Sequence, residues 1–189
     1  MASQALFRGR IRHTDKTVEQ LYKTEYHVYE KTRILLRLLL GMALVLVAAF
    51  SAFPTWVRVL LLLFGAWFLA SGDFPAQIRA DRVMQSRKAD LPAMEYAFFP
   101  DRVELSGEGS MTVRYPQFTR LVQDEEYLYL ILARDSICML ERESISPKGD
   151  QEFMKFMEQK TKLAWRREKG FLSLTFWDLR DMLRDRKQK

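Results

Sequence analysis

Residues 34–74 read ILLRLLLGMALVLVAAFSAFPTWVRVLLLLFGAWFLASGDF. Up to Ser71 nearly every side chain in this stretch is apolar or small, and Arg37 and Arg58 are its only charged residues. The rest of the chain is correspondingly polar. A small soluble protein has too little mass to bury two helices that are apolar on every face. The stretch therefore favours insertion in lipid over the alternative, a helical hairpin buried in a soluble core.

The apolar stretch divides into two runs, 34–53 and 56–74. Each has about the 20 residues that a helix needs to cross the hydrocarbon core of a bilayer. Pro54 lies between them, where it cannot continue the first helix and suits the start of the second. Because so few residues connect the runs, the sequence predicts a transmembrane hairpin of two antiparallel helices.

Positive charge predicts the orientation of this hairpin. The turn between the runs contributes only Arg58, and cationic loops stay on the cytoplasmic side of a membrane. Cationic side chains precede the first run and follow the second: Arg8, Arg10, Arg12, Lys16, Lys23, Lys31 and Arg33, then Arg79, Arg82, Arg87 and Lys88. We therefore expect a multi-pass protein of the cell membrane with both termini in the cytoplasm.

The polar residues of the two runs argue against a lone channel or pump. They lie near the ends of the runs, whereas a proton relay needs an ionisable group at mid-membrane. Small residues within the runs would instead allow close packing of the two helices: Gly41, Ala43, Ala48, Gly65 and Ala66.

The N-terminal segment 1–33 combines two patterns. Residues 5–13 alternate apolar and cationic side chains, which predicts a strand with a cationic face. This face could bind anionic lipid or nucleic acid, but we favour the solvent face of an edge strand. From Thr14, a suitable N-cap, apolar residues recur at helical spacing. With no Gly or Pro in between, this helix is expected to continue into the first span.

A polar linker, 75–92, leads to a predicted β domain over 93–165. Strand signals and turn residues alternate through it, and Gly149-Asp150 opens a helix whose apolar stripe includes Phe153 and Phe156. The expected strands cover 95–99, 102–106, 111–115, 118–122, 127–132 and 136–141. The fold class is thus an α+β membrane protein, in which a transmembrane hairpin accompanies a small barrel or sandwich closed by a C-terminal helix.

This arrangement resembles the YcxB-like family of bacterial membrane proteins. The resemblance rests on 96–103 (YAFFPDRV), 113–115 with Phe118, 127–130 and 151–153. The segment 139–142 lacks the proline and lysine of the family pattern, and Ser146 stands where the family often has phenylalanine. The resemblance implies a membrane location and a β domain similar to a pleckstrin-homology (PH) barrel. It implies no established activity.

The basic tail, 166–189, is expected to form an amphipathic helix. In a membrane-anchored chain, anionic lipid headgroups explain its charge better than nucleic acid, at about 1 kcal/mol for each cation near the surface. The candidate membrane-surface residues are Arg166, Arg167, Trp177, Arg180, Arg184 and Arg186. Docking of the tail on the β domain or on the N-terminal helix remains the open alternative. The expected partners are thus the lipid bilayer and, less specifically, a protein or a second copy of the chain.

No catalytic or cofactor motif is present in the sequence. Phosphate-binding loops, zinc-binding helices and Cys-x-x-Cys pairs are absent. The two histidines, His13 and His27, are far apart and have no cysteine near them. The acidic run 124–126 is interpreted as a solvated turn, and Cys138 as a small core residue. We therefore expect no enzyme, no cofactor and no metal.

The sequence thus favours a non-enzymatic, membrane-anchored cytoplasmic module that binds a partner through a groove or sheet edge. The alternative is an accessory subunit whose spans pack on a larger membrane transporter or enzyme.

Overall fold

The computed structural model describes residues 4–86, 93–107, 109–133 and 136–167. These residues divide into two compact units. The β unit consists of the described residues of 4–21 and 82–167, and the helical unit consists of 22–81. The fold is mixed α and β, as the sequence predicts.

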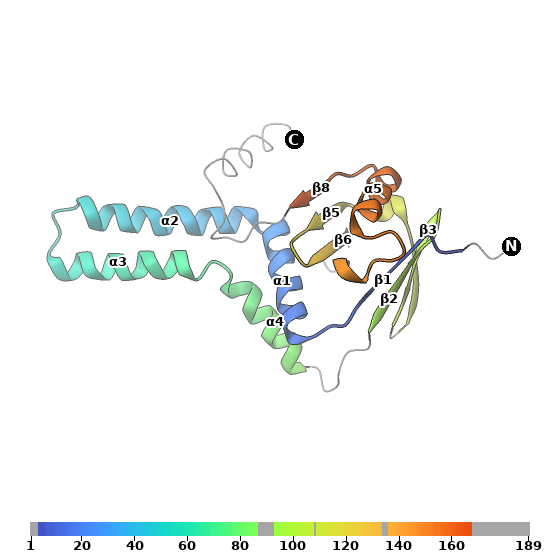
Figure 1. Cartoon of the computed structure of the whole chain (residues 1–189). Helices are drawn as coiled ribbons and strands as arrows, with labels where there is room; N and C mark the ends of the chain where they lie inside the picture. The colour runs from blue at the N-terminus through green and yellow to red at the C-terminus, as the bar shows by residue number, and fades with distance from the viewer. Residues whose placement is uncertain (1–3, 87–92, 108, 134–135, 168–189) are drawn as a thin grey trace. The chain divides into compact units, whose positions relative to one another are not determined.

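Four helices belong to the first part of the chain (Figure 1): α1 (Asp15–Tyr29), α2 (Lys31–Phe50), α3 (Thr55–Ala70) and α4 (Phe74–Ser86). At the start of α1, the Thr14 hydroxyl accepts a hydrogen bond from the Thr17 amide (3.4 Å), so the predicted N-cap is confirmed. The expected continuous helix from Thr14 into the first span is wrong, because α1 and α2 are separate helices that meet at Glu30. Ion pairs of the Glu30 carboxylate with Arg33 and Arg79 hold this junction.

The second apolar run also ends earlier than the sequence predicts. Helix α3 stops at Ala70, and a turn over 71–73 leads into α4, whose axis is bent by 55° from that of α3. The expected polar linker 75–92 therefore begins as a helix, which continues to Ser86.

Helices α2 and α3 pack closely where both carry glycine. A Cβ built on Gly41 would lie 3.2 Å from the Gly65 carbonyl oxygen, and one built on Gly65 would lie 3.1 Å from the Gly41 oxygen. Ala48 is also buried, but Ala43 and Ala66 are exposed. The predicted packing role is thus confirmed for three of the five small residues.

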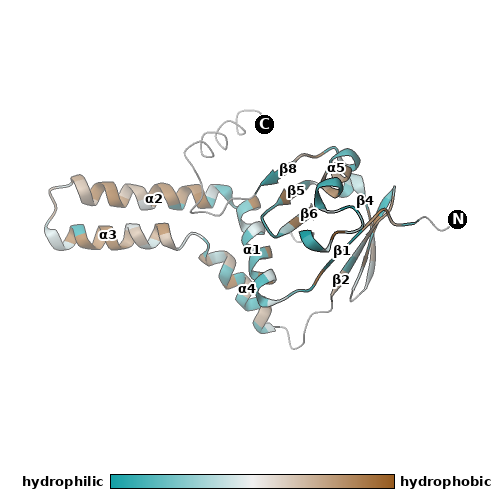
Figure 2. Ribbon diagram, viewed as in Figure 1, coloured by the Kyte–Doolittle hydropathy of each residue, from teal (hydrophilic) through white to brown (hydrophobic). Residues whose placement is uncertain are grey.

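Most residues of this helix pair are hydrophobic (Figure 2), and many of their large apolar side chains are exposed. Phe50 is 87% exposed and Trp56 is 68% exposed. By length and composition, α2 is one candidate for a membrane-crossing helix, near the N-terminus. The bent pair α3 and α4 would be a second if it is counted as one span.

The sequence predicts a small barrel or sandwich, and the β unit contains two four-stranded sheets that do not form a closed barrel. The first has the order β1-β2-β3-β4 and the second β7-β6-β5-β8. All pairs are antiparallel except β5 with β8. The strands are β1 (Phe7–Ile11), β2 (Met94–Phe98), β3 (Arg102–Ser106), β4 (Ser110–Arg114), β5 (Arg120–Gln123), β6 (Tyr127–Ala133), β7 (Ser136–Glu141) and β8 (Trp165–Arg167).

Strand β1 is an edge strand of the first sheet, so that interpretation of the N-terminal segment is confirmed. It pairs with β2 in register, with Gly9 opposite Tyr96. In the sequence β1 precedes α2 and α3, whereas β2 follows them. The helical hairpin is therefore an insertion between two paired strands of one sheet.

Helix α5 (Asp150–Thr161) packs on the core of the β unit, as the sequence predicts. Phe153 is fully buried, and its ring makes edge contacts with those of Phe7 and Phe98 at centroid distances of 5.6 and 4.6 Å. Because Phe7 comes from β1, the N-terminal strand contributes to the same core as the strands that follow the hairpin.

Candidate functional site

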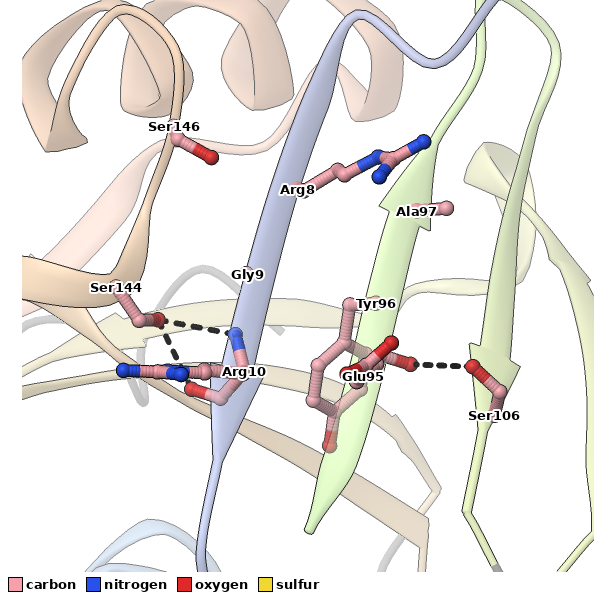
Figure 3. A pocket seen from close by; sticks show the side chains of 9 residues that line it. All are labelled: Arg8, Gly9, Arg10, Glu95, Tyr96, Ala97, Ser106, Ser144 and Ser146. Atoms are coloured by element: carbon pink, nitrogen blue, oxygen red, sulfur yellow. Dashed lines mark hydrogen bonds between the residues drawn. The ribbon is translucent and has the colours of Figure 1, made fainter.

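A polar hollow lies beside β1 in the β unit (Figure 3). Its volume is about 480 Å³. Its lining comes from β1, β2, the end of β3 and the segment after β7: Arg8, Gly9, Arg10, Glu95, Tyr96, Ala97, Ser106, Ser144 and Ser146. The hollow thus brings together three parts of the chain that are far apart in sequence.

The alternation of β1 decides which of its side chains reach solvent. Phe7, Gly9 and Ile11 are buried, while Arg8 and Arg10 are exposed. Successive side chains of a strand point to opposite faces, so the two arginines share the outer face. The predicted cationic face is therefore a feature of the folded strand.

Although β1 is the last strand of its sheet, both of its edges have hydrogen-bond partners. One edge pairs with β2. On the other, the Arg8 amide donates to the Ser146 carbonyl (2.8 Å) and the Ser146 amide donates to the Arg8 carbonyl (2.9 Å). Two residues further, the Arg10 amide donates to the Ser144 hydroxyl oxygen (3.0 Å), and that hydroxyl lies 2.9 Å from the Arg10 carbonyl. A ligand at this strand must therefore be recognised by side chains, not by strand addition.

The two guanidinium groups extend in different directions (Figure 3). Arg8 reaches over β2 near Ala97, whereas Arg10 reaches toward Ser144. In the part of the chain that the structure describes, neither group has an ion pair. Glu95 lies directly opposite Arg10 in the pairing of the two strands, yet the Arg10 side chain points away from it. The hollow thus offers two separated positive charges beside one carboxylate.

A second polar cluster lies within the helical unit. The Asp73 carboxylate, in the turn between α3 and α4, accepts hydrogen bonds from His27 Nε2 (2.7 Å) and Lys23 Nζ (3.1 Å) of α1. Burial alone would raise the pKa of Asp73, but the hydrogen bonds from His27 and Lys23 together outweigh it and lower the pKa. His27 is only 7% exposed, so it is a packed histidine rather than a surface one.

Arg79 of α4 extends this cluster toward the junction of α1 and α2. Its guanidinium lies 3.7 Å from the Glu25 carboxylate and 3.5 Å from the Glu30 carboxylate. Both glutamates are 8% exposed. Buried charges of this kind need partners, because desolvation disfavours them when they are alone. The cluster therefore fixes α1 and α4 at the ends of α2 and α3.

The acidic turn 124–126 is more ordered than the expected solvated turn. Asp124 accepts hydrogen bonds from the Glu126 and Tyr127 amides, the Tyr129 hydroxyl and the Gln20 side chain. Glu126 pairs with Lys16 of α1 (2.9 Å). These carboxylates have structural partners, and within the described ranges no group of three or more His, Cys, Asp or Glu residues could hold a metal ion.

Cys138 is buried in β7, as predicted for a core residue, and burial raises the pKa of its thiol to about 12. A thiol with such a pKa remains protonated and unreactive at neutral pH.

The predicted membrane-surface residues are only partly described. Arg166 and Arg167 lie in strand β8, so their placement in a tail helix is wrong, and the Arg167 guanidinium contacts the exposed Glu125 carboxylate at 3.1 Å. Trp177, Arg180, Arg184 and Arg186 lie outside the described residues. Neither Arg166 nor Arg167 lines the hollow.

Sequence reasoning missed the hollow and the Asp73 cluster as sites. The alternation of β1 gave the cationic face, but no local signal places Ser144 and Ser146 beside it. For Asp73, the available signal was Ser71-Gly72-Asp73, a turn-forming triplet inside an apolar run.

Comparison with known proteins identifies part of the chain. Residues 98–157 match the sequence model of the family described as YcxB-like protein. This range runs from the end of β2 into α5 and covers less than half of the chain. No curated protein and no solved structure matches the chain. The stretch 98–157 is therefore similar to the YcxB-like family, as the resemblance of its motifs predicts.

Proposed function

We propose that this chain is a non-enzymatic binding module, anchored in the cell membrane by α2 and α3, that presents its β unit to a partner in the cytoplasm. The observation that carries the proposal is the pairing of β1 with β2. If α2 alone crossed a membrane, these two strands would lie on opposite sides of it. Their pairing supports an even number of crossings, in which α3 returns the chain to the first side.

The surface of the helix pair supports a lipid environment. Leu36, Phe50, Trp56 and Leu63 are all more than half exposed. In water, each Å² of apolar surface left uncovered forgoes about 25 cal/mol. In lipid this penalty disappears, because the surroundings are as apolar as the side chains.

The turn of the hairpin supports the same topology. The Arg58 guanidinium, in the first turn of α3, donates to the Ala48 carbonyl (2.8 Å) and approaches the Ala49 carbonyl (3.5 Å) at the end of α2. These carbonyls have no partner within their own helix. The arginine can therefore remain at the membrane surface while it caps α2. Helix α3 has 16 residues, or about 24 Å, which a locally thinned bilayer accommodates.

Charge supports a cytoplasmic β unit, since cations cluster on both flanks of the hairpin and cationic flanks remain inside. Anionic lipid headgroups are accordingly a second binding partner, available to exposed cations such as Arg166.

A hairpin exchange tests the proposal against the accessory-subunit alternative. Residues 34–70 are replaced by an unrelated two-span hairpin, and partners are crosslinked in cells and purified in mild detergent. A binding module keeps its crosslinked partner with the foreign hairpin, because the β unit holds it. Loss of the partner upon exchange would favour an accessory subunit. Recovery of the native chain in the soluble fraction would contradict membrane anchoring altogether.

A further inference from the structure

We propose that the hollow beside β1 binds an extended acidic peptide segment of a partner protein, with alternate carboxylates of that segment meeting Arg8 and Arg10. This inference rests on the proposed function, because it names the chemistry of the partner that the β unit holds.

The spacing of the two arginines suits an extended chain. They are two residues apart on one face of β1, so their Cα atoms are separated by about 6.6–6.8 Å at the usual rise of a strand. Alternate side chains of an extended peptide have the same separation. A segment lying along β1 with acidic residues at every second position therefore matches the spacing of the two arginines along the strand. Because both side chains are exposed, each guanidinium can turn toward one carboxylate.

Charge also favours an acidic ligand. Arg102, on the same sheet, already has acidic partners: its guanidinium contacts Glu104 at 2.8 Å and Asp101 at 3.3 Å. Among the described residues, Arg8 and Arg10 have no such partner, and both are exposed. Exposed guanidinium groups without an internal carboxylate are available for charge-assisted, bidentate binding of an external one.

The geometry is less suited to one phosphate group. Phosphate sites bring several N–H donors together on a single anion. Here the two guanidinium groups diverge (Figure 3). The backbone amides of Arg8 and Arg10 are already bonded to Ser146 and Ser144. Two separated carboxylates therefore match the hollow better than one compact anion.

The backbone under the arginines is held in place before any ligand binds. Gly9, between them, faces the core so closely that a Cβ there would lie 2.6 Å from Leu140 Cδ2. With β2 on one edge and Ser144 and Ser146 on the other, the ligand does not have to order the strand, which favours affinity.

The test uses the full chain in neutral detergent and a fluorescent peptide with glutamate at alternate positions, Glu-Thr-Glu-Thr-Glu, with fluorescence anisotropy as the readout. We expect Arg8→Gln and Arg10→Gln each to weaken binding about fivefold, the effect of one exposed charge pair. Arg12→Gln removes the same charge from an exposed residue that follows β1 and does not line the hollow, so it should change affinity less than about twofold. Glu95→Gln should tighten binding, because it removes a like charge.

Several results would overturn the inference. Equal weakening by all three arginine variants would mean non-specific attraction. Equal affinity for a peptide of the same composition with adjacent glutamates would mean that the site does not distinguish the spacing of the carboxylates. Displacement of the peptide by millimolar inorganic phosphate would identify a small-anion site. If Arg8→Gln and Arg10→Gln weakened binding to anionic vesicles but not to the peptide, the hollow would be a lipid site. None of these results affects the hairpin exchange, so this inference can fail while the anchored module stands. Unchanged melting temperatures of the variants would exclude misfolding as the cause.

Discussion

Gly9 of β1 lies opposite Tyr96 of β2, although both apolar helices lie between them in the sequence. This pairing has two consequences. The segment before the hairpin and the segment after it belong to one sheet, so they must lie on the same side of any membrane that α2 crosses. The core around the matched range 98–157 also includes a strand outside it, because Phe7 of β1 packs on Phe153.

Gly9→Ala should destabilise the β unit. The added Cβ would lie 2.6 Å from Cδ2 of Leu140, a fully buried side chain, and overpacking of a core costs about 1–3 kcal/mol. Gly109→Ala is the matched control, because a Cβ there meets nothing within 4 Å. Chemical denaturation of the full chain in detergent measures both. Equal stabilities of the two variants would show that β1 does not pack on β7 as described.

Gly65→Leu should loosen the helix pair. A Cβ at this position would lie 2.8 Å from Val45 Cγ2 and 3.1 Å from the Gly41 carbonyl oxygen, and the backbone oxygen cannot move unless the helices separate. Ala66→Leu adds a larger side chain on an exposed part of the same helix and should leave the pair intact. The overpacking should cost the Gly65 variant about 1–3 kcal/mol of stability. Its thermal loss of helicity in detergent should therefore occur several degrees below that of the native chain. A lower stability for Ala66→Leu than for Gly65→Leu would refute the close packing.

Asp73→Asn should lower the free energy of unfolding at neutral pH by about 1–3 kcal/mol, because it removes a carboxylate that holds His27 and Lys23. The pKa of Asp73 is lowered below its ordinary value of 3.8 in the folded chain. Its contribution is therefore fully present above that value, and it is lost as the pH falls through the lower, folded pKa.

The pH dependence of this difference provides the check. The gap in stability between the native chain and Asp73→Asn should be large at about pH 7 and should narrow at about pH 3. A gap that stays constant over this range would mean that the carboxylate has the same pKa in the folded and unfolded chain.

Two Tyr→Phe changes should have opposite effects. The buried Tyr26 hydroxyl has no hydrogen-bond partner among the residues that the structure describes, so Tyr26→Phe should be neutral or stabilising. The Tyr115 hydroxyl donates to the Phe99 carbonyl and also lies 3.3 Å from the Arg102 carbonyl. Tyr115→Phe should therefore cost about 0.5–1.5 kcal/mol. The denaturant midpoints of the two variants measure these effects. A larger loss of stability for Tyr26→Phe than for Tyr115→Phe would show that the Tyr26 hydroxyl is hydrogen-bonded.

Local patterns predicted most of the elements. The alternation over 5–13 identified β1 and its cationic face, and the expected strand 102–106 has the bounds of β3. Local patterns could not identify the partner of β1, because alternation specifies a face and not a neighbour. The three-residue strand β8 is too short to have a detectable period, so the sequence pattern places Arg166 and Arg167 in the tail helix.

The breaks in the helices were missed for a different reason. No glycine or proline marks Glu30, and its position between α1 and α2 is held by ion pairs with Arg33 and the distant Arg79. Gly72 is a local indication that α3 ends, but the apolar residues around it favour a longer helix. Local sequence patterns therefore do not predict the features that depend on contacts between distant segments, such as the break at Glu30.

The central claim, a two-span hairpin with both flanks in the cytoplasm, is tested most directly by cysteine labelling in intact cells. Native Cys138 is buried and gives little background. Ala52→Cys, in the exposed turn between α2 and α3, should react with a membrane-impermeant maleimide added outside the cells. Gln4→Cys, exposed before β1, should react only after lysis. Labelling of Gln4→Cys from outside, or protection of Ala52→Cys until lysis, would contradict the account.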